Sequence, residues 1–178
     1  MNFSLHEHSN GVETAAGNRV VYDIAGNEAH FGAAHVDGHA LVWELGEPGE
    51  GALLSAEIEF DANTSWLARC DRIDFPPGGV AYTHKHPGPG IRYLLHGSIE
   101  IQTAGHTTAY APGEAWFESG PEPVYAAASP TVETAFVRVL LLPLEWEGKR
   151  TIRYVDPADD DKPKLQRPTV FFDRRLVS

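Results

Sequence analysis

Residues 76–97 read PPGGVAYTHKHPGPGIRYLLHG and contain two strand-length segments, Val80–His86 and Ile91–Leu95, separated by a turn of proline and glycine. In a strand, residues i and i+2 project to the same face, so the side chains of His84 and His86 are predicted to point into one space. Two neutral imidazoles that converge can supply two of the ligands of a site for a divalent transition metal. On spacing alone, the alternative is two histidines on a solvated strand face.

Short apolar or alternating runs recur on both sides of this stretch, separated by Gly, Pro, Asn and Asp. Each run has the length of a strand, and the breaks have the chemistry of turns. The runs outside residues 76–97 are Val20–Ile24, Ala40–Leu45, Leu53–Phe60, Trp66–Phe75, Ser98–Thr103, His106–Ala111, Ala115–Glu118, Val124–Ala128 and Thr134–Leu142. Many short strands at close spacing predict an all-β sandwich or barrel, and the sequence around Gly97 suggests a tight hairpin.

Both ends of the chain differ from this middle part. Residues 1–10 are polar, lack the apolar segment of a secretory signal and are expected to be flexible. Residues 157–168 (PADDDKPKLQRP) are predicted to form an exposed connector. Residues 169–178 are predicted to form a strand-like tail that docks either on its own barrel or on a neighbouring subunit.

Size and charge restrict the functions that the chain can have. Its 178 residues are room for one domain, so residues 1–178 are predicted to form a single domain. A net charge of −11 repels phosphate backbones and anionic lipid heads, which argues against nucleic acid and membrane surfaces as partners. No apolar run approaches the length that spans a bilayer, and the lone Cys70 cannot form an internal disulfide. We therefore expect a cytoplasmic protein with Cys70 in its core.

The order of Gly78, His84, His86 and Gly97 resembles the first sequence motif of the cupin superfamily. The resemblance extends over residues 73–143. It implies an all-β fold, the double-stranded β-helix or jelly-roll barrel of the cupins, here with extra N-terminal strands and an extended C-terminal tail. It also implies that the barrel interior holds the site and, by analogy, that the protein is a homodimer.

The chain departs from this motif at two ligand positions. Metal-binding cupins have a glutamate where this chain has Gly90, and a second-motif histidine where it has Val124. His84 and His86 remain as metal ligands by resemblance. Because two imidazoles rarely hold a catalytic metal by themselves, Glu118 is the predicted third ligand, and its alternative is a charged residue at the barrel rim.

Arg92 follows Gly90 by two residues and is therefore predicted to face the interior. A buried arginine needs an anion, so Arg92 either binds the carboxylate of a substrate in a bidentate manner or forms an internal salt bridge to Glu114 or Glu118.

Two tyrosines are candidates for substrate contacts. Tyr82 precedes His84 by two residues and is predicted to line the same cavity, as a core residue or a substrate contact. Tyr125 is either a pocket hydroxyl or a partly buried core tyrosine.

Three functions agree with these residues. The first is a metal-dependent enzyme, a dioxygenase or an isomerase, that acts on a small anionic organic molecule; His84 and His86 would bind Fe, Mn, Ni or Zn, Arg92 would orient the substrate, and all three would be catalytic. The second is a non-catalytic module that has lost its metal site and binds a small molecule. The third is a metal-free isomerase that uses one histidine as a general base.

Overall fold

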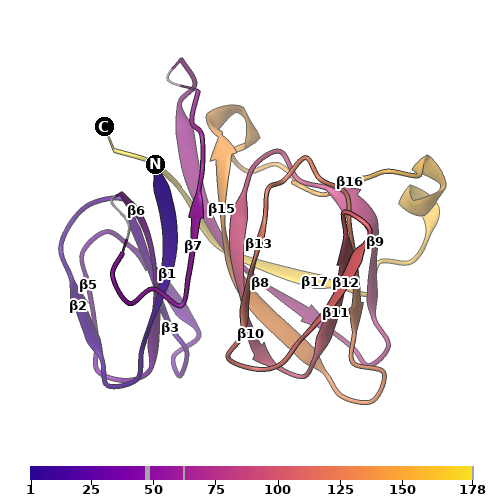
Figure 1. Cartoon of the computed structure of the whole chain (residues 1–178), viewed down its shortest axis with the longest axis horizontal. Helices are drawn as coiled ribbons and strands as arrows, with labels where there is room; N and C mark the ends of the chain where they lie inside the picture. Colours follow the sequence, from indigo (N-terminus) through magenta and orange to yellow (C-terminus); the bar gives the residue numbers. More distant parts are fainter. Residues whose placement is uncertain (47–48, 62, 178) are drawn as a thin grey trace.

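The computed structural model describes residues 1–46, 49–61 and 63–177, and over these residues it consists of antiparallel β-strands and two short 3-10 helices. Figure 1 shows an N-terminal sheet standing beside a barrel. The N-terminal sheet has the strand order β4-β3-β6-β1-β7. Its strands are β1 (Asn2–His8), β3 (Arg19–Asp23), β4 (Glu28–Phe31), β6 (Ala40–Gly46) and β7 (Leu54–Glu57), and the ribbon of β2 (Val12–Thr14) and β5 (Ala34–Val36) packs against it.

The barrel is built from two facing sheets, one of order β13-β10-β15-β8-β17 and the other of order β12-β11-β14-β9-β16. Their strands are β8 (Trp66–Phe75), β9 (Val80–Lys85), β10 (Gly90–His96), β11 (Ile99–Thr103), β12 (His106–Tyr110), β13 (Ala115–Glu118), β14 (Val124–Ala128), β15 (Thr134–Pro143), β16 (Arg153–Tyr154) and β17 (Arg167–Arg175). The chain alternates between the two sheets, which is the jelly-roll arrangement of a cupin barrel. The predicted all-β cupin fold with extra N-terminal strands is therefore confirmed.

The turn at Gly97 joins the two sheets instead of forming a hairpin. Strand β10 belongs to one sheet and β11 to the other, so the predicted tight hairpin is wrong. Gly97 has a φ of +81°, and a Cβ atom there would lie 2.5 Å from the backbone oxygen of Glu133. Glycine is required because only a residue without a side chain fits both this backbone conformation and this close approach.

The first residues of the chain form the middle of the N-terminal sheet, so the expectation that they are flexible is wrong. Strand β1 lies between β6 and β7 and buries Phe3 and Leu5 on one face. These side chains pack in one core with the outer face of the barrel sheet. Trp43 on β6 is 1% exposed and donates a hydrogen bond from Nε1 to the backbone oxygen of Ile91, at 3.1 Å. The N-terminal sheet and the barrel therefore share one hydrophobic core.

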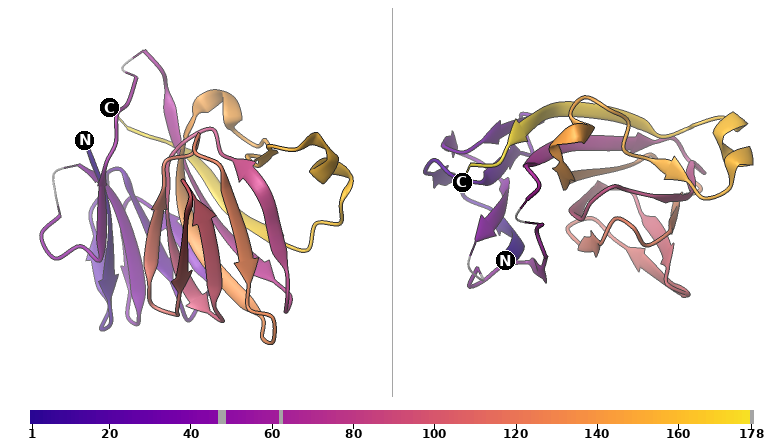
Figure 2. Two further views of the ribbon diagram at one scale, coloured as in Figure 1. Left: turned by 45° about the vertical axis from the view of Figure 1, so that its right-hand side comes forward. Right: turned by 90° about the horizontal axis from the view of Figure 1, so that it is seen from above.

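The C-terminal tail docks on its own barrel. Strand β17 pairs with β8, and Figure 2 shows it running along the barrel sheet toward the N-terminal sheet. There the rings of Phe171 and Phe172 pack against Tyr22 and Phe31, at centroid distances of 5.7 and 6.3 Å. The preceding connector is mostly exposed but contains the 3-10 helix η2 (Pro157–Asp161); the other 3-10 helix, η1 (Leu144–Trp146), follows β15.

Within the described part of the chain, no helix has the length and apolar character needed to cross a bilayer.

Candidate functional site

The barrel interior contains a cavity of about 490 Å³. Side chains from nine barrel strands line it, and residues paired between β8 and β15 have the same character. Asp71 on β8 lies opposite Arg138 on β15, and Ile73 lies opposite Phe136. One half is apolar and includes Ile73, Phe75, Ile101, Trp116, Val124 and Phe136. The other half is polar and includes Asp71, His84, His86, Arg92, Glu118 and Arg138. The predicted convergence of His84, His86 and Arg92 inside the barrel is therefore confirmed.

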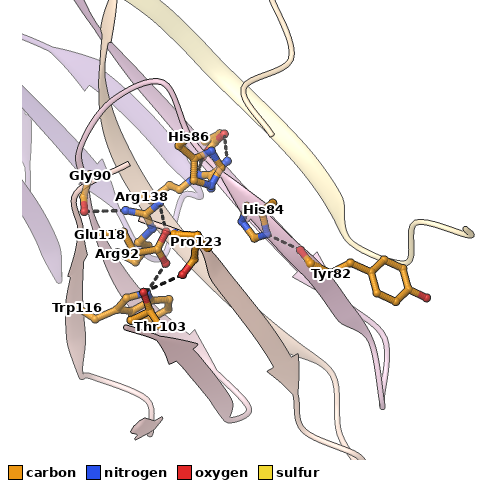
Figure 3. Close-up of polar contacts among 11 residues, drawn as sticks. Tyr82, His84, His86, Gly90, Arg92, Thr103, Trp116, Glu118, Pro123 and Arg138 are labelled. Atoms are coloured by element: carbon orange, nitrogen blue, oxygen red, sulfur yellow. Dashed lines mark hydrogen bonds and ion pairs between the residues drawn. The ribbon is translucent and has the colours of Figure 1, made fainter. Parts of the chain in front are cut away.

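An irregularity in strand β9 decides which side chains face the cavity. Val124 on β14 pairs with His84, but Ala126, two residues on, pairs with Ala81, three residues back. The extra residue on β9 is a β-bulge, and it breaks the simple alternation of the strand. Ala81, His84 and His86 face the cavity, whereas Tyr82 points away from it (Figure 3). The prediction that Tyr82 lines the same cavity as His84 is wrong for this reason.

Tyr125 also lies outside the cavity lining. Its neighbours Val124 and Ala126 face the interior, so the alternation of strand β14 directs Tyr125 to the opposite face. A contact between either tyrosine and a molecule in the barrel therefore has no support from this geometry.

The hydrogen bonds of His84 leave one ring nitrogen available. Nδ1 of His84 lies 2.7 Å from the backbone oxygen of Tyr82, so Nδ1 carries the proton and donates it. The other nitrogen, Nε2, has no hydrogen-bond partner among the described residues and retains its lone pair. The two imidazole rings lie 4.9 Å apart, edge to face. His84 is thus a buried imidazole of fixed orientation, and its Nε2 can accept a proton or a hydrogen bond, or bind a metal ion.

His86 is engaged differently. Nη1 of Arg138 lies 3.3 Å from Nε2 of His86. Because a guanidinium only donates, this contact uses the lone pair on Nε2 and places the proton of His86 on Nδ1. The backbone nitrogen of His86 donates to the oxygen of Gly120 at 2.8 Å, which ties the histidine strand to the loop after β13.

Arg92 is fully buried and paired with Glu118, one of the two alternatives left open by the sequence. Its Nη2 lies 2.6 Å from Oε2 of Glu118, whose Oε1 accepts a hydrogen bond from Trp116 at 2.9 Å. Nη1 of Arg92 donates to the backbone oxygen of Gly90 at 2.7 Å. The short contact of Nη2 lacks hydrogen-bond alignment, so its hydrogens have no aligned acceptor in the described structure. Arg92 therefore keeps donor capacity toward a molecule in the cavity.

Gly90 makes room for this arginine. A Cβ atom at Gly90 would lie 2.9 Å from Nη1 of Arg92 and 2.8 Å from the backbone oxygen of Val139. A side chain at this position would therefore collide with Arg92 and with the backbone of β15.

Arg138 and Asp71 form a second buried ion pair that sequence reasoning missed. Nε and Nη2 of Arg138 lie 2.6 and 3.0 Å from the two carboxylate oxygens of Asp71. Both residues are less than 10% exposed. The available signal was a single arginine in the otherwise apolar run Thr134–Leu142, because a charge within a buried strand needs a partner.

The residues present do not fit a metal ion. Of the predicted ligands, only His84 has a ring nitrogen with a free lone pair. In His86 the lone pair on Nε2 faces Arg138, and Nδ1, which has no hydrogen-bond partner among the described residues, carries the proton; Glu118 is paired with Arg92. Over the described residues, no group of three or more His, Cys, Asp or Glu side chains is placed to hold a metal.

Burial and the two arginines set the protonation of the site. Burial lowers the pKa of His84, and Arg138 and Arg92 lower it further while Glu118 opposes them. The pKa of His86 lies well below its usual range, again mainly because of burial and then because of Arg138 and Arg92. Burial lowers the pKa of Arg92 to about 10, opposed by Glu118. At neutral pH the histidines are neutral and the arginines are charged.

Acid is expected to destabilise the protein as the pH falls below about 6.5, the pKa of an unfolded histidine. Because the folded protein holds the pKa of His84 and His86 below this value, the unfolded chain binds more protons there. The free energy of unfolding then falls by up to about 1.4 kcal/mol per pH unit for each histidine. Urea denaturation across this pH range measures the slope. The variant His84→Gln/His86→Gln should have a flatter dependence, and equal slopes would contradict the lowered pKa values.

No model of a known protein family matches the sequence, and no curated protein matches it. Solved structures with a similar chain do exist. The RmlC-like cupin from Shewanella frigidimarina NCIMB 400 aligns over 51% of this chain and 94% of its own, at 17% identity and a TM-score of 0.38. The polyketide cyclase RemF from Streptomyces resistomycificus aligns over 56% of this chain and 67% of its own, at 24% identity and a TM-score of 0.42.

A third similar structure is the DMSP lyase DddQ from Ruegeria pomeroyi DSS-3, which aligns over 53% of this chain and 45% of its own, at 22% identity and a TM-score of 0.43. The strand order of the present chain is that of a cupin jelly-roll barrel. A shared fold does not carry a shared activity, so the function of this chain depends on the chemistry of its site.

Proposed function

We propose that the barrel binds a small amphipathic organic anion and that it does so without a resident metal ion. The observation that carries this proposal is the division of one cavity into an apolar half and a polar half, with three buried guanidinium groups in its lining. An apolar part of the ligand would occupy the first half, and its polar or charged group would meet the second.

The size and lining of the cavity support a small organic ligand. Its volume of about 490 Å³ falls within the range of roughly 300–1,000 Å³ that is typical of sites for small molecules. Trp116 and Phe136 pack edge to face in the apolar half, with ring centroids 5.3 Å apart. Such a surface favours a ring or a short hydrocarbon chain.

The charges that line the cavity support an anionic group on that ligand. The lining contains six cationic side chains and three carboxylates, although the whole chain carries a net charge of −11. All three carboxylates are paired with buried arginines, in the pairs Arg92–Glu118, Arg138–Asp71 and Arg69–Asp173. Lys149 and Lys164 therefore add positive charge to the lining, and Arg150, which also lies near Asp160, is a further cation there; such charges attract anions.

The Fe, Mn, Ni or Zn of the first functional hypothesis is not part of this proposal, because too few donor atoms are free to bind a metal ion. Homodimerisation and a cytoplasmic location stay predictions.

A second candidate is metal-independent proton transfer by His84. The observation that favours it is the free Nε2 of a neutral imidazole whose Nδ1–H is held by Tyr82. Such a base is suited to abstracting a proton from the carbon next to a carbonyl group, because a buried guanidinium nearby can stabilise the oxyanion that forms. Chelators would then leave turnover unchanged, and His84→Gln would abolish turnover while retaining ligand binding.

Binding of two fluorescent probes tests the proposed function. Anilinonaphthalene sulfonate has an aromatic body and an anionic group, whereas phenylnaphthylamine has nearly the same body and no charge. The sulfonate is expected to bind at least about tenfold more tightly, a difference of about 1.4 kcal/mol. Its affinity should fall with added salt and be unchanged by chelator.

Variants locate the binding. Lys149→Gln/Arg150→Gln removes two cations that line the cavity, and Arg174→Gln/Arg175→Gln removes two that do not. Only the first pair should weaken the sulfonate. Equal affinity for both probes, or a loss of binding on chelation, would contradict the proposal.

A further inference from the structure

Arg138 occupies an unusual place for an arginine. It comes from β15, in the barrel sheet opposite β9, and its Nη1 contacts Nε2 of His86, a residue of the two-histidine motif (Figure 3). The side chain is 9% exposed, so this cation is largely removed from water. The position of Arg138 on β15 therefore places a positive charge next to His86 of the two-histidine motif.

The orientation of Arg138 is set by Asp71. Two nearly parallel hydrogen bonds to that carboxylate use Nε and Nη2, at 2.6 and 3.0 Å. A planar guanidinium gripped in this bidentate way has one remaining edge, and Nη1 on that edge points to His86. The contact with His86 thus follows from the Arg138–Asp71 pair.

A second guanidinium lies beside the first. Arg92 and Arg138 are direct partners in the register of β10 and β15, and both side chains line the cavity. Two buried like charges on paired strands repel each other, and burying each of them costs free energy that well-packed apolar residues would not cost. An anion in the cavity would interact favourably with both at once.

We propose that Arg138 is the resident cation of this barrel: its guanidinium caps Nε2 of His86, keeps divalent metals from the two histidines, and meets the negatively charged oxygen of the bound ligand. Its role toward the ligand rests on the proposed function, whereas its role against metal does not. Arg138 belongs to none of the residues that the cupin motif supplies.

Removal of this cation is expected to let the two histidines bind a divalent metal. In Arg138→Met, Nε2 of His86 loses its partner and becomes available beside the free Nε2 of His84. The two imidazoles, with water as further ligands, are then a site for Co²⁺ or Zn²⁺. Arg138→Lys is the matched control, because it keeps a positive charge in the same place.

The experiment adds Co²⁺ to the metal-free purified proteins and measures the visible absorption of the bound ion and the bound equivalents after dialysis. Arg138→Met is expected to bind about one equivalent, at least about tenfold more tightly than the original protein and Arg138→Lys. Anilinonaphthalene sulfonate should bind Arg138→Met about tenfold or more weakly, with phenylnaphthylamine little changed.

A folded Arg138→Met that takes up no more Co²⁺ than the original protein would overturn the capping role. If the original protein binds the sulfonate and Arg138→Met binds it equally well, the ligand role fails and the proposed function stands. If the original protein does not bind the sulfonate, the proposed function fails, and the Co²⁺ result still decides the capping role.

A measurement on the unaltered protein covers the case in which Arg138→Met does not fold. Nitrogen-15 NMR of the histidine rings reports which nitrogen carries the proton. The capping contact requires the proton of His86 on Nδ1 and an unprotonated Nε2. A proton on Nε2 of His86 would overturn the proposal without any variant.

Discussion

Replacement of Glu118 by alanine is expected to lower the free energy of unfolding by about 3–5 kcal/mol. Arg92 is 1% exposed, and Glu118 is its paired carboxylate at 2.6 Å, so the variant would leave a charged guanidinium in the barrel without a counterion. The hydrogen bond from Trp116 to Glu118 is lost as well. Denaturant unfolding of the variant and the original protein measures the difference.

Two further variants show whether the loss comes from the unpaired charge. Glu122→Ala removes an exposed carboxylate from the same loop region and should change the stability by less than about 0.5 kcal/mol. Arg92→Met/Glu118→Leu removes both charges and should recover most of the stability lost in Glu118→Ala. A double variant as unstable as the single one would mean that packing, and not charge, is responsible.

The second large effect is expected at Trp43, where alanine should cost about 3–5 kcal/mol. This side chain is 1% exposed in the core shared by the N-terminal sheet and the barrel, and its hydrogen bond to Ile91 joins the two. Denaturant unfolding followed by near-ultraviolet circular dichroism measures the loss. Leu53→Ala, at a position that is 43% exposed, is the control. A loss below about 1 kcal/mol would contradict a shared core.

The barrel was predictable because its signals are local. Strand-length alternation, turns rich in proline and glycine, and the spacing of His84, His86 and Gly97 are all read from short stretches of sequence. The inward position of Arg92 followed from the same alternation. The sequence left two possible partners for Arg92, Glu114 and Glu118. The register of β10 with β13 places Gly90 opposite Glu118 and so identifies Glu118 as the partner.

The errors arise where distant segments meet or a strand is irregular. Tyr82 faces away from His84 because of one extra residue in β9, and a bulge has no signature in the alternation itself. The pair of Arg138 and Asp71 joins residues 67 positions apart. The terminus read as flexible is ordered because Phe3 and Leu5 alternate with the polar residues that dominate its composition.

The Arg138–His86 contact was the least predictable feature and matters most for function. The two histidines were interpreted as metal ligands because nothing in residues 76–97 shows that a guanidinium from β15 reaches one of them. Only the assembled barrel brings the charges together, and they change the chemistry expected of the motif.

The metal content of the unaltered protein shows directly whether the capped histidine motif binds metal. The protein is exposed to excess Fe²⁺, Mn²⁺, Ni²⁺ and Zn²⁺, dialysed without chelator, and analysed by inductively coupled plasma mass spectrometry. A barrel whose histidine motif is capped by a guanidinium should retain well under about a tenth of an equivalent of each metal, since one free imidazole does not compete with hydration. About one equivalent of any of these metals, lost in His84→Ala/His86→Ala, would contradict the account.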